Sequence, residues 1–210
     1  MTECACDYGS YASETDWPAD VSALLYRRLL EVGLGGRSVL EVGCGHGRLL
    51  VGALLAGAAT ATGVELDREA LDGARARAAD FGLEGRIAFL EGDGADLPLE
   101  PHDVVVLDRV ICCDQAPGEL VGRTVVAAGG VYAITVPESR GMRGAWNRVA
   151  YAALRAWDRI TGSPDRAWVH DVRRMEARLT AAGFRLTTAE HLGKWFVGIY
   201  RRPLPGSRHD

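Results

Sequence analysis

EVGCGHGR (41–48) joins the apolar stretch SVLEVG (38–43) to a segment with the composition of a helix, and it carries glycines at alternate positions. Gly43, Gly45 and Gly47 let the backbone turn tightly and approach a ligand without interference from a Cβ atom. A Gly-rich turn between a strand and a helix is where α/β sheets bind ligands, outside their strand ends. The stretch therefore predicts an α/β fold with a ligand beside this turn.

The rest of the chain alternates strand-like and helix-like patterns. Helical periodicity covers 17–34 and 68–82, and strand-like stretches cover 38–43, 60–66, 86–92, 102–108 and 131–137. Strands that are apolar on both faces predict a parallel sheet covered on both sides. The last two strand candidates, FRLTTAEHL (184–192) and KWFVGIYRR (194–202), are joined by a short Gly-containing link, which predicts an antiparallel edge hairpin.

These patterns predict one Rossmann-like α/β domain with a mostly parallel sheet of seven strands. We expect residues 1–36 to form an N-terminal helical lid or cap and residues 37–210 to form the main domain. Residues 138–168 are longer than a plain connection requires, so we expect a helical insertion there that forms part of a substrate pocket.

Carboxylates follow the second and third strands. Glu65 lies eighteen residues after Gly47, where a carboxylate can accept hydrogen bonds from both hydroxyls of a ribose. Asp93, in EGDGADLP (91–98), is placed to accept a hydrogen bond from an adenine amino group. Arg48 occupies the position of the last glycine in a dinucleotide fingerprint, which argues against an NAD enzyme.

These features, in this order, resemble the class I S-adenosylmethionine-dependent methyltransferases over about residues 38–201. The resemblance implies S-adenosylmethionine as cofactor and S-adenosylhomocysteine as product, with the glycine loop beside the methionine part. The residues that it places at the cofactor are Glu41, Gly43, Cys44, Gly45, Gly47, Glu65, Leu66, Asp93, Gly94, Ala95, Asp108 and Arg109. A Rossmann-like domain that uses its glycines only as a turn is the alternative.

Methyl transfer requires alignment of the acceptor, exclusion of water and, for some acceptors, removal of a proton. Asp108 ends the fourth strand, and His170 precedes the last helix, so both are candidate catalytic residues. Packing or capping at the helix start is the alternative for His170. Arg109 either binds a substrate carboxylate or forms an ion pair with Asp114 or another acid. The substrate-binding candidates are Tyr8, Tyr11, Trp17, Arg109, Trp146 and His170.

The insertion carries aromatic and apolar residues at helical spacings, which predicts one apolar face that either packs or forms a lid over the substrate. These residues are Trp146, Tyr151, Leu154 and Trp157. Its arginines meet either an acidic substrate or solvent; they are Arg140, Arg143 and Arg148. His102, His191 and His209 are expected at the surface.

Adjacent cysteines occur in LDRVICCDQ (107–115), after the fourth strand. A zinc site needs about four ligands, and Cys112 and Cys113 would have to recruit Cys4 and Cys6 from the N-terminal segment. We therefore expect no metal site and interpret Cys112 and Cys113 as small apolar residues of a pocket wall or core.

A finer resemblance is to the magnesium-protoporphyrin O-methyltransferase branch, in which a carboxylate of a large planar ring accepts the methyl group. It rests on VVVLDRVICC, ITVPESR, the helical insertion, WVH and AAGF. The chain departs from that branch at 112–115, where a His-Tyr-Pro-like triplet is expected. The resemblance therefore carries over the architecture and not the porphyrin.

Composition and charge limit the classes of binding partner that we expect. The formal net charge of −4 argues against a general binder of nucleic acids or membrane surfaces. An odd count of five cysteines and the lack of an apolar leader favour reduced thiols and a cytoplasmic location, and the Arg-rich, Lys-poor composition is typical of a GC-rich bacterial genome. We expect a monomer or homodimer that methylates O or N of a small molecule, possibly in bacterial specialised metabolism. The alternative is a cofactor-binding protein that does not methylate, such as a cyclase or a regulatory partner.

Overall fold

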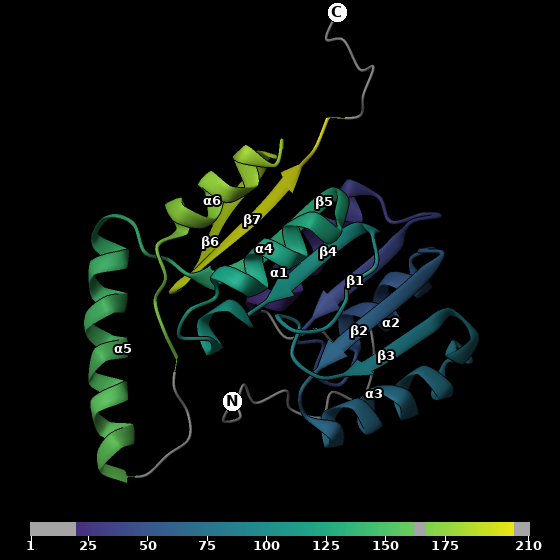
Figure 1. Ribbon diagram of the computed structural model, residues 1–210, viewed down its shortest axis with the longest axis horizontal. Helices are drawn as coiled ribbons and strands as arrows, with labels where there is room; N and C mark the ends of the chain where they lie inside the picture. The colour runs from purple at the N-terminus through teal and green to yellow at the C-terminus, as the bar shows by residue number, and fades with distance from the viewer. Residues whose placement is uncertain (1–19, 162–166, 204–210) are drawn as a thin grey trace, which may run out of the picture.

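The structure is a computed structural model, and it describes residues 20–161 and 167–203. Seven strands form one sheet in the order β3-β2-β1-β4-β5-β7-β6 (Figure 1). The strands are β1 (Ser38–Val42), β2 (Thr60–Glu65), β3 (Ile87–Glu91), β4 (His102–Asp108), β5 (Ala128–Pro137), β6 (Arg185–Leu192) and β7 (Trp195–Arg201). The first five strands are parallel, and β7 runs antiparallel to both β5 and β6.

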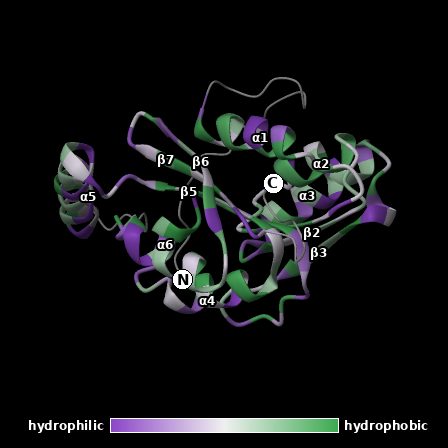
Figure 2. Cartoon of the chain, turned by 90° about the horizontal axis from the view of Figure 1, so that it is seen from above, coloured by the Kyte–Doolittle hydropathy of each residue, from purple (hydrophilic) through white to green (hydrophobic). Residues whose placement is uncertain are grey.

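Helices cover both faces of the sheet (Figure 2). One face carries α1 (Val21–Val32), α2 (Arg48–Leu55) and α3 (Arg68–Asp80). The other face carries α4 (Gly118–Ala127) and α6 (Val172–Ala181). The longest helix, α5 (Gly141–Thr161), stands at the edge of the molecule beside neither face. Two short 3₁₀ turns, η1 (Glu84–Arg86) and η2 (Ile111–Cys113), precede β3 and follow β4.

The strand register brings the candidate motifs to one edge of the sheet. Val42 pairs with Val64 in β2, and Asp108 in β4 pairs with Thr135 in β5. Because these strands are parallel, the loops that follow β1, β2, β3 and β4 all leave from the same edge. Between β1 and β4 the strand order reverses, since α2 covers one face and α4 the other. This is the switch point at which open α/β sheets form their ligand crevice.

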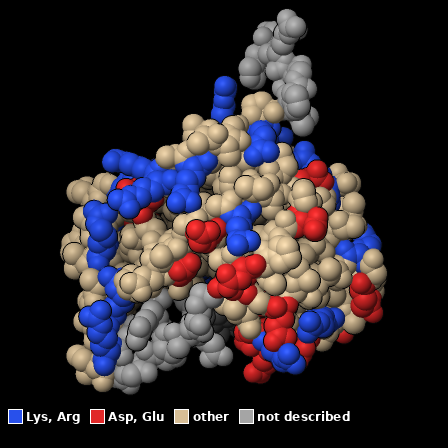
Figure 3. Space-filling model, viewed as in Figure 1, with Lys and Arg blue, Asp and Glu red and all other residues tan. Residues whose placement is uncertain are grey.

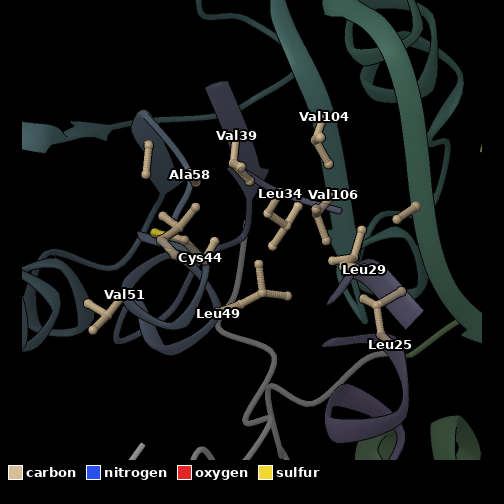
Figure 4. Close-up of a cluster of buried hydrophobic side chains, with 14 of the residues drawn as sticks. Leu25, Leu29, Leu34, Val39, Cys44, Leu49, Val51, Ala58, Val104 and Val106 are labelled. Carbon is tan, nitrogen blue, oxygen red and sulfur yellow. The ribbon is translucent and has the colours of Figure 1, made fainter. Parts of the chain in front are cut away.

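Burial of branched side chains on both faces of β1 and β4 fixes this arrangement. On one face, Val39 and Val104 pack with Leu25 and Leu29 of α1 and with Leu49 of α2 (Figure 4). Each of these side chains is at most 4% exposed. The burial of such side chains contributes about 1.5–3 kcal/mol each, so this cluster stabilises the central strands strongly.

The predicted sheet, with its antiparallel terminal hairpin and its helical insertion after β5, is confirmed. Some boundaries were wrong. The helix expected at 17–34 runs only from Val21 to Val32, because Asp20 caps it by accepting a hydrogen bond from the Ala23 N–H at 3.0 Å. The fifth strand begins at Ala128, three residues earlier than the apolar pattern indicated. Among the described residues, no helix is both long enough and apolar enough to span a membrane.

Candidate functional site

The glycine loop after β1 requires its glycines. Gly43, Gly45 and Gly47 have φ angles of 74°, 50° and 69°, a region in which a side chain is strained. A Cβ atom on Gly43 would lie 2.7 Å from Cγ2 of Val110, which follows β4. The loops after β1 and β4 are therefore in direct contact across the switch point.

Glu65 ends β2 and is held by backbone N–H groups from two loops. Its Oε2 accepts a hydrogen bond from Gly45 at 2.9 Å, and its Oε1 accepts from Leu66 at 2.8 Å and Asp67 at 3.2 Å. Oε2 has a further lone pair, so the group retains capacity to accept a hydrogen bond from a ligand. The Leu66 side chain is about half exposed beside it.

The loop after β3 is shaped around Asp93. Asp93 Oδ1 accepts a hydrogen bond from the Ala95 N–H at 2.8 Å, which closes a tight turn. A Cβ atom on Gly94 would lie only 2.4 Å from Cγ1 of Val42, so this loop packs directly on the end of β1. The Gly92 N–H donates to the Glu65 carbonyl at 2.9 Å, which ties this loop to the end of β2.

Glu41, in β1, is a buried carboxyl group whose hydrogen-bonding capacity is only partly used. It is 4% exposed, and its Oε2 has no hydrogen-bond partner among the residues that the structure describes. Burial, together with the nearby Asp108 and Glu65, raises the pKa of Glu41 well above its usual value of 4.5, while Arg109 opposes the shift. Burial, with smaller contributions from Glu41 and Glu65, raises the pKa of the Cys44 thiol well above its usual value. The site thus concentrates negative potential where a positively charged ligand group would be stabilised.

Asp108 is held from two elements. Ser22 of α1 donates a hydrogen bond to its Oδ2 at 2.5 Å, and Thr135 of β5 donates to its Oδ1. Burial raises the pKa of Asp108, although Arg109 and the two hydroxyl groups oppose the shift. These contacts fix α1 against the sheet, and the expected catalytic role of Asp108 stays a prediction. Sequence reasoning missed Ser22 and Thr135, because no local pattern connects Ser22 to an acid 86 residues away.

Arg109 pairs with Asp108 rather than Asp114. Its Nε lies 3.8 Å from Asp108 Oδ2, so the pair involves its own neighbour. It is the only described non-glycine residue with a positive φ, 56°, and its N–H donates to Thr135 Oγ1 at 2.8 Å. A strained backbone held at a strand end is common at functional sites. Whether Arg109 contacts cofactor or substrate stays a prediction.

His170 lies beside the segment that follows β4. Its Nε2 is 2.8 Å from the Asp114 carbonyl, and the nearby Trp168 N–H donates to the Cys112 carbonyl at 2.8 Å. A carbonyl only accepts, so Nε2 carries the proton and Nδ1 has the lone pair in the neutral ring. Burial lowers the pKa of His170, although the Asp114 carbonyl opposes the shift. The capping role is filled by Asp171, which accepts from the Arg173 N–H at 3.0 Å.

The adjacent cysteines line the same turn. The Cys112 and Cys113 thiols lie 3.1 Å and 3.4 Å from the Arg109 carbonyl. Cys112 is buried and Cys113 half-buried, and neither forms a disulfide. Within 20–161 and 167–203, no cluster of His, Cys, Asp or Glu has a geometry suited to a metal ion. Cys4 and Cys6 lie outside the described residues.

The aromatic residues of the insertion do not share one face, contrary to the expectation. Trp146 is 75% exposed, whereas Tyr151 is 3% exposed and packs toward the domain. Five residues of helix turn the side chain by about 140°, which places these two on nearly opposite sides. The expected role of Trp146 in substrate binding stays a prediction. Tyr8, Tyr11 and Trp17, the other aromatic candidates, lie outside the described residues.

A buried ionic cluster follows β5. Glu138, 3% exposed, accepts hydrogen bonds from Arg140 Nε at 3.0 Å and pairs with His191 Nε2 at 2.5 Å. Arg140 also contacts Glu176 at 3.0 Å. Burial alone would raise the pKa of Glu138, but the hydrogen bonds from Arg140 and His191 lower it to about 2. Arg140 is therefore structural, which corrects the expectation of solvent or substrate for it, whereas His191 is exposed, as expected, and also pairs with Glu138.

The comparisons with known proteins agree with this geometry. Residues 39–121 match the family described as "Methyltransferase domain". A ribosomal protein L11 methyltransferase of Pseudomonas aeruginosa is 35% identical over 135 residues, which cover 61% of this chain and 46% of that protein. The chain thus spans less than half the length of this relative.

Solved structures with the same fold cover more of the chain. Magnesium protoporphyrin IX methyltransferase (ChlM) of Synechocystis PCC 6803, with bound S-adenosylhomocysteine, has a TM-score of 0.67 at 19% identity and covers 87% of this chain and 81% of its own. The [4+2]-cyclase SpnF has a TM-score of 0.68 at 17% identity and covers 96% and 89%.

The fold, the family match and the motif positions together define the class. Residues 39–121 match a methyltransferase domain, and the described residues have the fold of class I S-adenosylmethionine-dependent methyltransferases. The resemblance read from the glycine loop, Glu65 and Asp93 is thereby confirmed, and so is the cofactor of the family, S-adenosylmethionine.

Proposed function

We propose that the chain binds S-adenosylmethionine at the β1–β4 switch point and transfers its methyl group to an oxygen or nitrogen atom of a small molecule. The observation that supports cofactor binding is the buried acidic cluster beside a loop that only glycine can form. Asp108 and Glu65 both help to raise the pKa of Glu41, and Oε2 of Glu41 has no hydrogen-bond partner among the described residues. A sulfonium and an ammonium group are the complement of such a cluster.

The residues of the site fit the cofactor. The loop of Gly43, Gly45 and Gly47 would face its methionine part, Glu65 its ribose, and Asp93 with Gly94 and Ala95 its adenine. When bound, the cofactor supplies an activated methyl group on a good leaving group. The protein must then align the acceptor, exclude water and hold the proton that leaves it.

His170 is the proposed proton acceptor. Its lowered pKa keeps the ring neutral at pH 7, and the hydrogen bond to the Asp114 carbonyl leaves the lone pair on Nδ1. Asp108 is less suited, because Ser22 and Thr135 already engage both of its oxygens. In this proposal Asp108 positions α1 and the end of β4.

The acceptor side is assigned to the segments around β5. Residues 138–161 would border the acceptor with Arg109, whereas Trp146, 75% exposed on α5, is not assigned to it. The candidates Tyr8, Tyr11 and Trp17 lie outside the described residues. Two proteins of the same fold that the chain covers over most of their length are a magnesium protoporphyrin IX methyltransferase and a [4+2]-cyclase. This supports a small acceptor.

A labelled-methyl assay tests the proposal. The full chain is incubated with S-adenosylmethionine carrying a labelled methyl group and with pools of small molecules that bear hydroxyl, carboxyl or amino groups. Label that enters a small molecule in the presence of wild-type protein, and not of a Glu65→Ala, Asp93→Ala double variant, supports it. Label that enters only protein substrates contradicts the choice of acceptor.

A protein acceptor is the second candidate, favoured by the names of the sequence relatives, which are ribosomal protein L11 methyltransferases. Adding purified ribosomal protein L11 to the same assay separates the two candidates. A non-methylating role is the third, favoured by the likeness to the cyclase SpnF. In that case the cofactor would bind but no acceptor of any class would gain label.

A further inference from the structure

The outer face of α5, defined here by Met142, Trp146, Val149, Trp157 and Ile160, is an exposed apolar strip on a peripheral helix. These five side chains are between 64% and 85% exposed. Successive members are three or four residues apart, except that Ala153 lies between Val149 and Trp157. The five side chains therefore form one continuous row along the helix. Exposed apolar rows of this length are uncommon on soluble proteins and mark interaction sites.

The opposite side of α5 attaches the helix to the domain. Asn147 Nδ2 donates to the carbonyls of Glu138 at 2.8 Å and Lys194 at 2.9 Å, and Tyr151 is buried beside it. Arg155 donates to the Ala167 carbonyl at 3.0 Å. Because the anchored side and the outer face are on opposite sides of one helix, the outer face points away from the domain at its edge (Figure 1).

The charge of α5 is opposite to that of the chain. Residues 141–161 contain four arginines and one acidic residue, although the whole protein has a formal net charge of −4. Blue side chains line this edge of the molecule (Figure 3). Arg143 and Arg159 are exposed and flank the outer face on its two sides, where their long side chains can reach past the apolar row.

We infer that the outer face of α5 is a docking surface for an anionic lipid bilayer. A basic helix with tryptophan and aliphatic residues on one face lies in the plane of the membrane interface, with its apolar face inserted about 5–10 Å. Tryptophan is suited to that depth, and arginine to the anionic headgroups. The helix lies at the edge of the molecule, where a bilayer can approach it from outside (Figure 1).

Pairing with a second copy through this face is the weaker explanation. A helix of 21 residues is about 31 Å long, so its strip is roughly 31 Å by 10 Å. A stable pair of proteins buries about 800 Å² on each partner, so the strip alone is too small for such a pair. An antiparallel pair would also bring Arg143 of one copy near Arg159 of the other, and like charges repel.

Vesicle sedimentation with the full chain tests the inference. The protein is mixed at low salt with vesicles of phosphatidylcholine alone and with vesicles that contain about one third phosphatidylglycerol. We expect binding to the anionic vesicles only, weakened about tenfold or more by Trp146→Ser. Each of Arg143→Gln and Arg159→Gln should weaken it by about fivefold.

Matched controls lie on α4. Val126, 82% exposed, and Arg123, also exposed, provide Val126→Ser and Arg123→Gln, which should leave vesicle binding unchanged. All five substituted side chains are exposed, so melting temperatures should not move. Equal binding to both vesicle types, or none, overturns the inference. So does light scattering that shows a wild-type dimer which Trp146→Ser converts to a monomer without any vesicle binding.

Discussion

Two buried glutamates, one in each half of the sheet, show how differently the same side chain can be used. Glu41 in β1 and Glu138 after β5 are 4% and 3% exposed. Glu138 has an arginine and a histidine as partners, and its pKa falls to about 2. Glu41 lies among other acids, and its pKa rises well above 4.5. The charge of Glu138 is compensated within the fold, whereas that of Glu41 is left for a ligand to compensate.

The two halves of the sheet, which contain Glu41 and Glu138 respectively, differ in a similar way. Strands β1 to β4 carry loops fixed by glycines and by backbone N–H groups, which suits a cofactor that is the same for a whole family. The region after β5 carries the ionic cluster around Glu138 and the long helix α5. We therefore expect substitutions in the two halves to separate into effects on ligand binding and effects on stability or acceptor choice.

The largest expected effect is on stability, at Glu138. Glu138→Gln leaves Arg140 with one fewer anionic partner in a mostly buried cluster, and we expect a loss of about 3–5 kcal/mol in the free energy of unfolding. Urea denaturation measures it, with the exposed Glu119→Gln as control, expected within about 0.5 kcal/mol. A folded Glu138→Gln protein that has lost cofactor affinity would contradict the separation of the halves.

The next effect is on catalysis, at His170. His170→Gln should lower kcat by about 100-fold or more with little change in cofactor affinity, because only proton transfer is lost. The lowered pKa of His170 also predicts that wild-type activity persists as the pH falls below 6.5, since the ring stays neutral there. An unchanged kcat would leave His170 with a packing role alone.

A smaller effect is the pH dependence of stability, which has opposite signs for Glu41 and Glu138. The folded-state pKa of Glu41 lies above 4.5, so its contribution to stability is present below pH 4.5 and is lost as the pH rises through the folded-state pKa. Glu138 has the reverse sign: its contribution is present above pH 4.5 and is lost as the pH falls toward about 2. Glu41→Gln should therefore raise stability at pH 7, and Glu138→Gln should not.

Unfolding measured from pH 3 to pH 8 in both variants checks these signs. If Glu41→Gln lost stability at pH 7, the account of Glu41 as an uncompensated acid would be wrong.

The smallest effect is expected at Cys113. It is half-buried and its thiol donates to the Arg109 carbonyl, a contact that a serine hydroxyl can also make, so Cys113→Ser should change stability by no more than about 0.5 kcal/mol. Labelled-methyl transfer should be unaffected. A large loss of activity would instead assign Cys113 a direct role at the acceptor.

The sequence predicted the fold and the cofactor side well because their signals are local. Gly43, Gly45 and Gly47 lie within five residues, Glu65 ends β2, and Asp93 lies in the loop directly after β3. The contacts that sequence reasoning missed join distant segments. Ser22 reaches Asp108 across 86 residues, and His191 reaches Glu138 across 53. Helical spacing showed that α5 is amphipathic, but only packing showed that Trp146 points outward and Tyr151 inward.

Calorimetric titration of S-adenosylhomocysteine into the full chain at pH 7 tests the central claim most directly. We expect saturable binding to wild-type protein and to Glu69→Ala, an exposed neighbour on α3, and at least about tenfold weaker binding to Glu65→Ala, because Glu65 is the proposed acceptor of the ribose hydrogen bonds. Absence of binding to wild-type protein, or equal affinity in Glu65→Ala, would contradict the assignment of the cofactor to the β1–β4 edge.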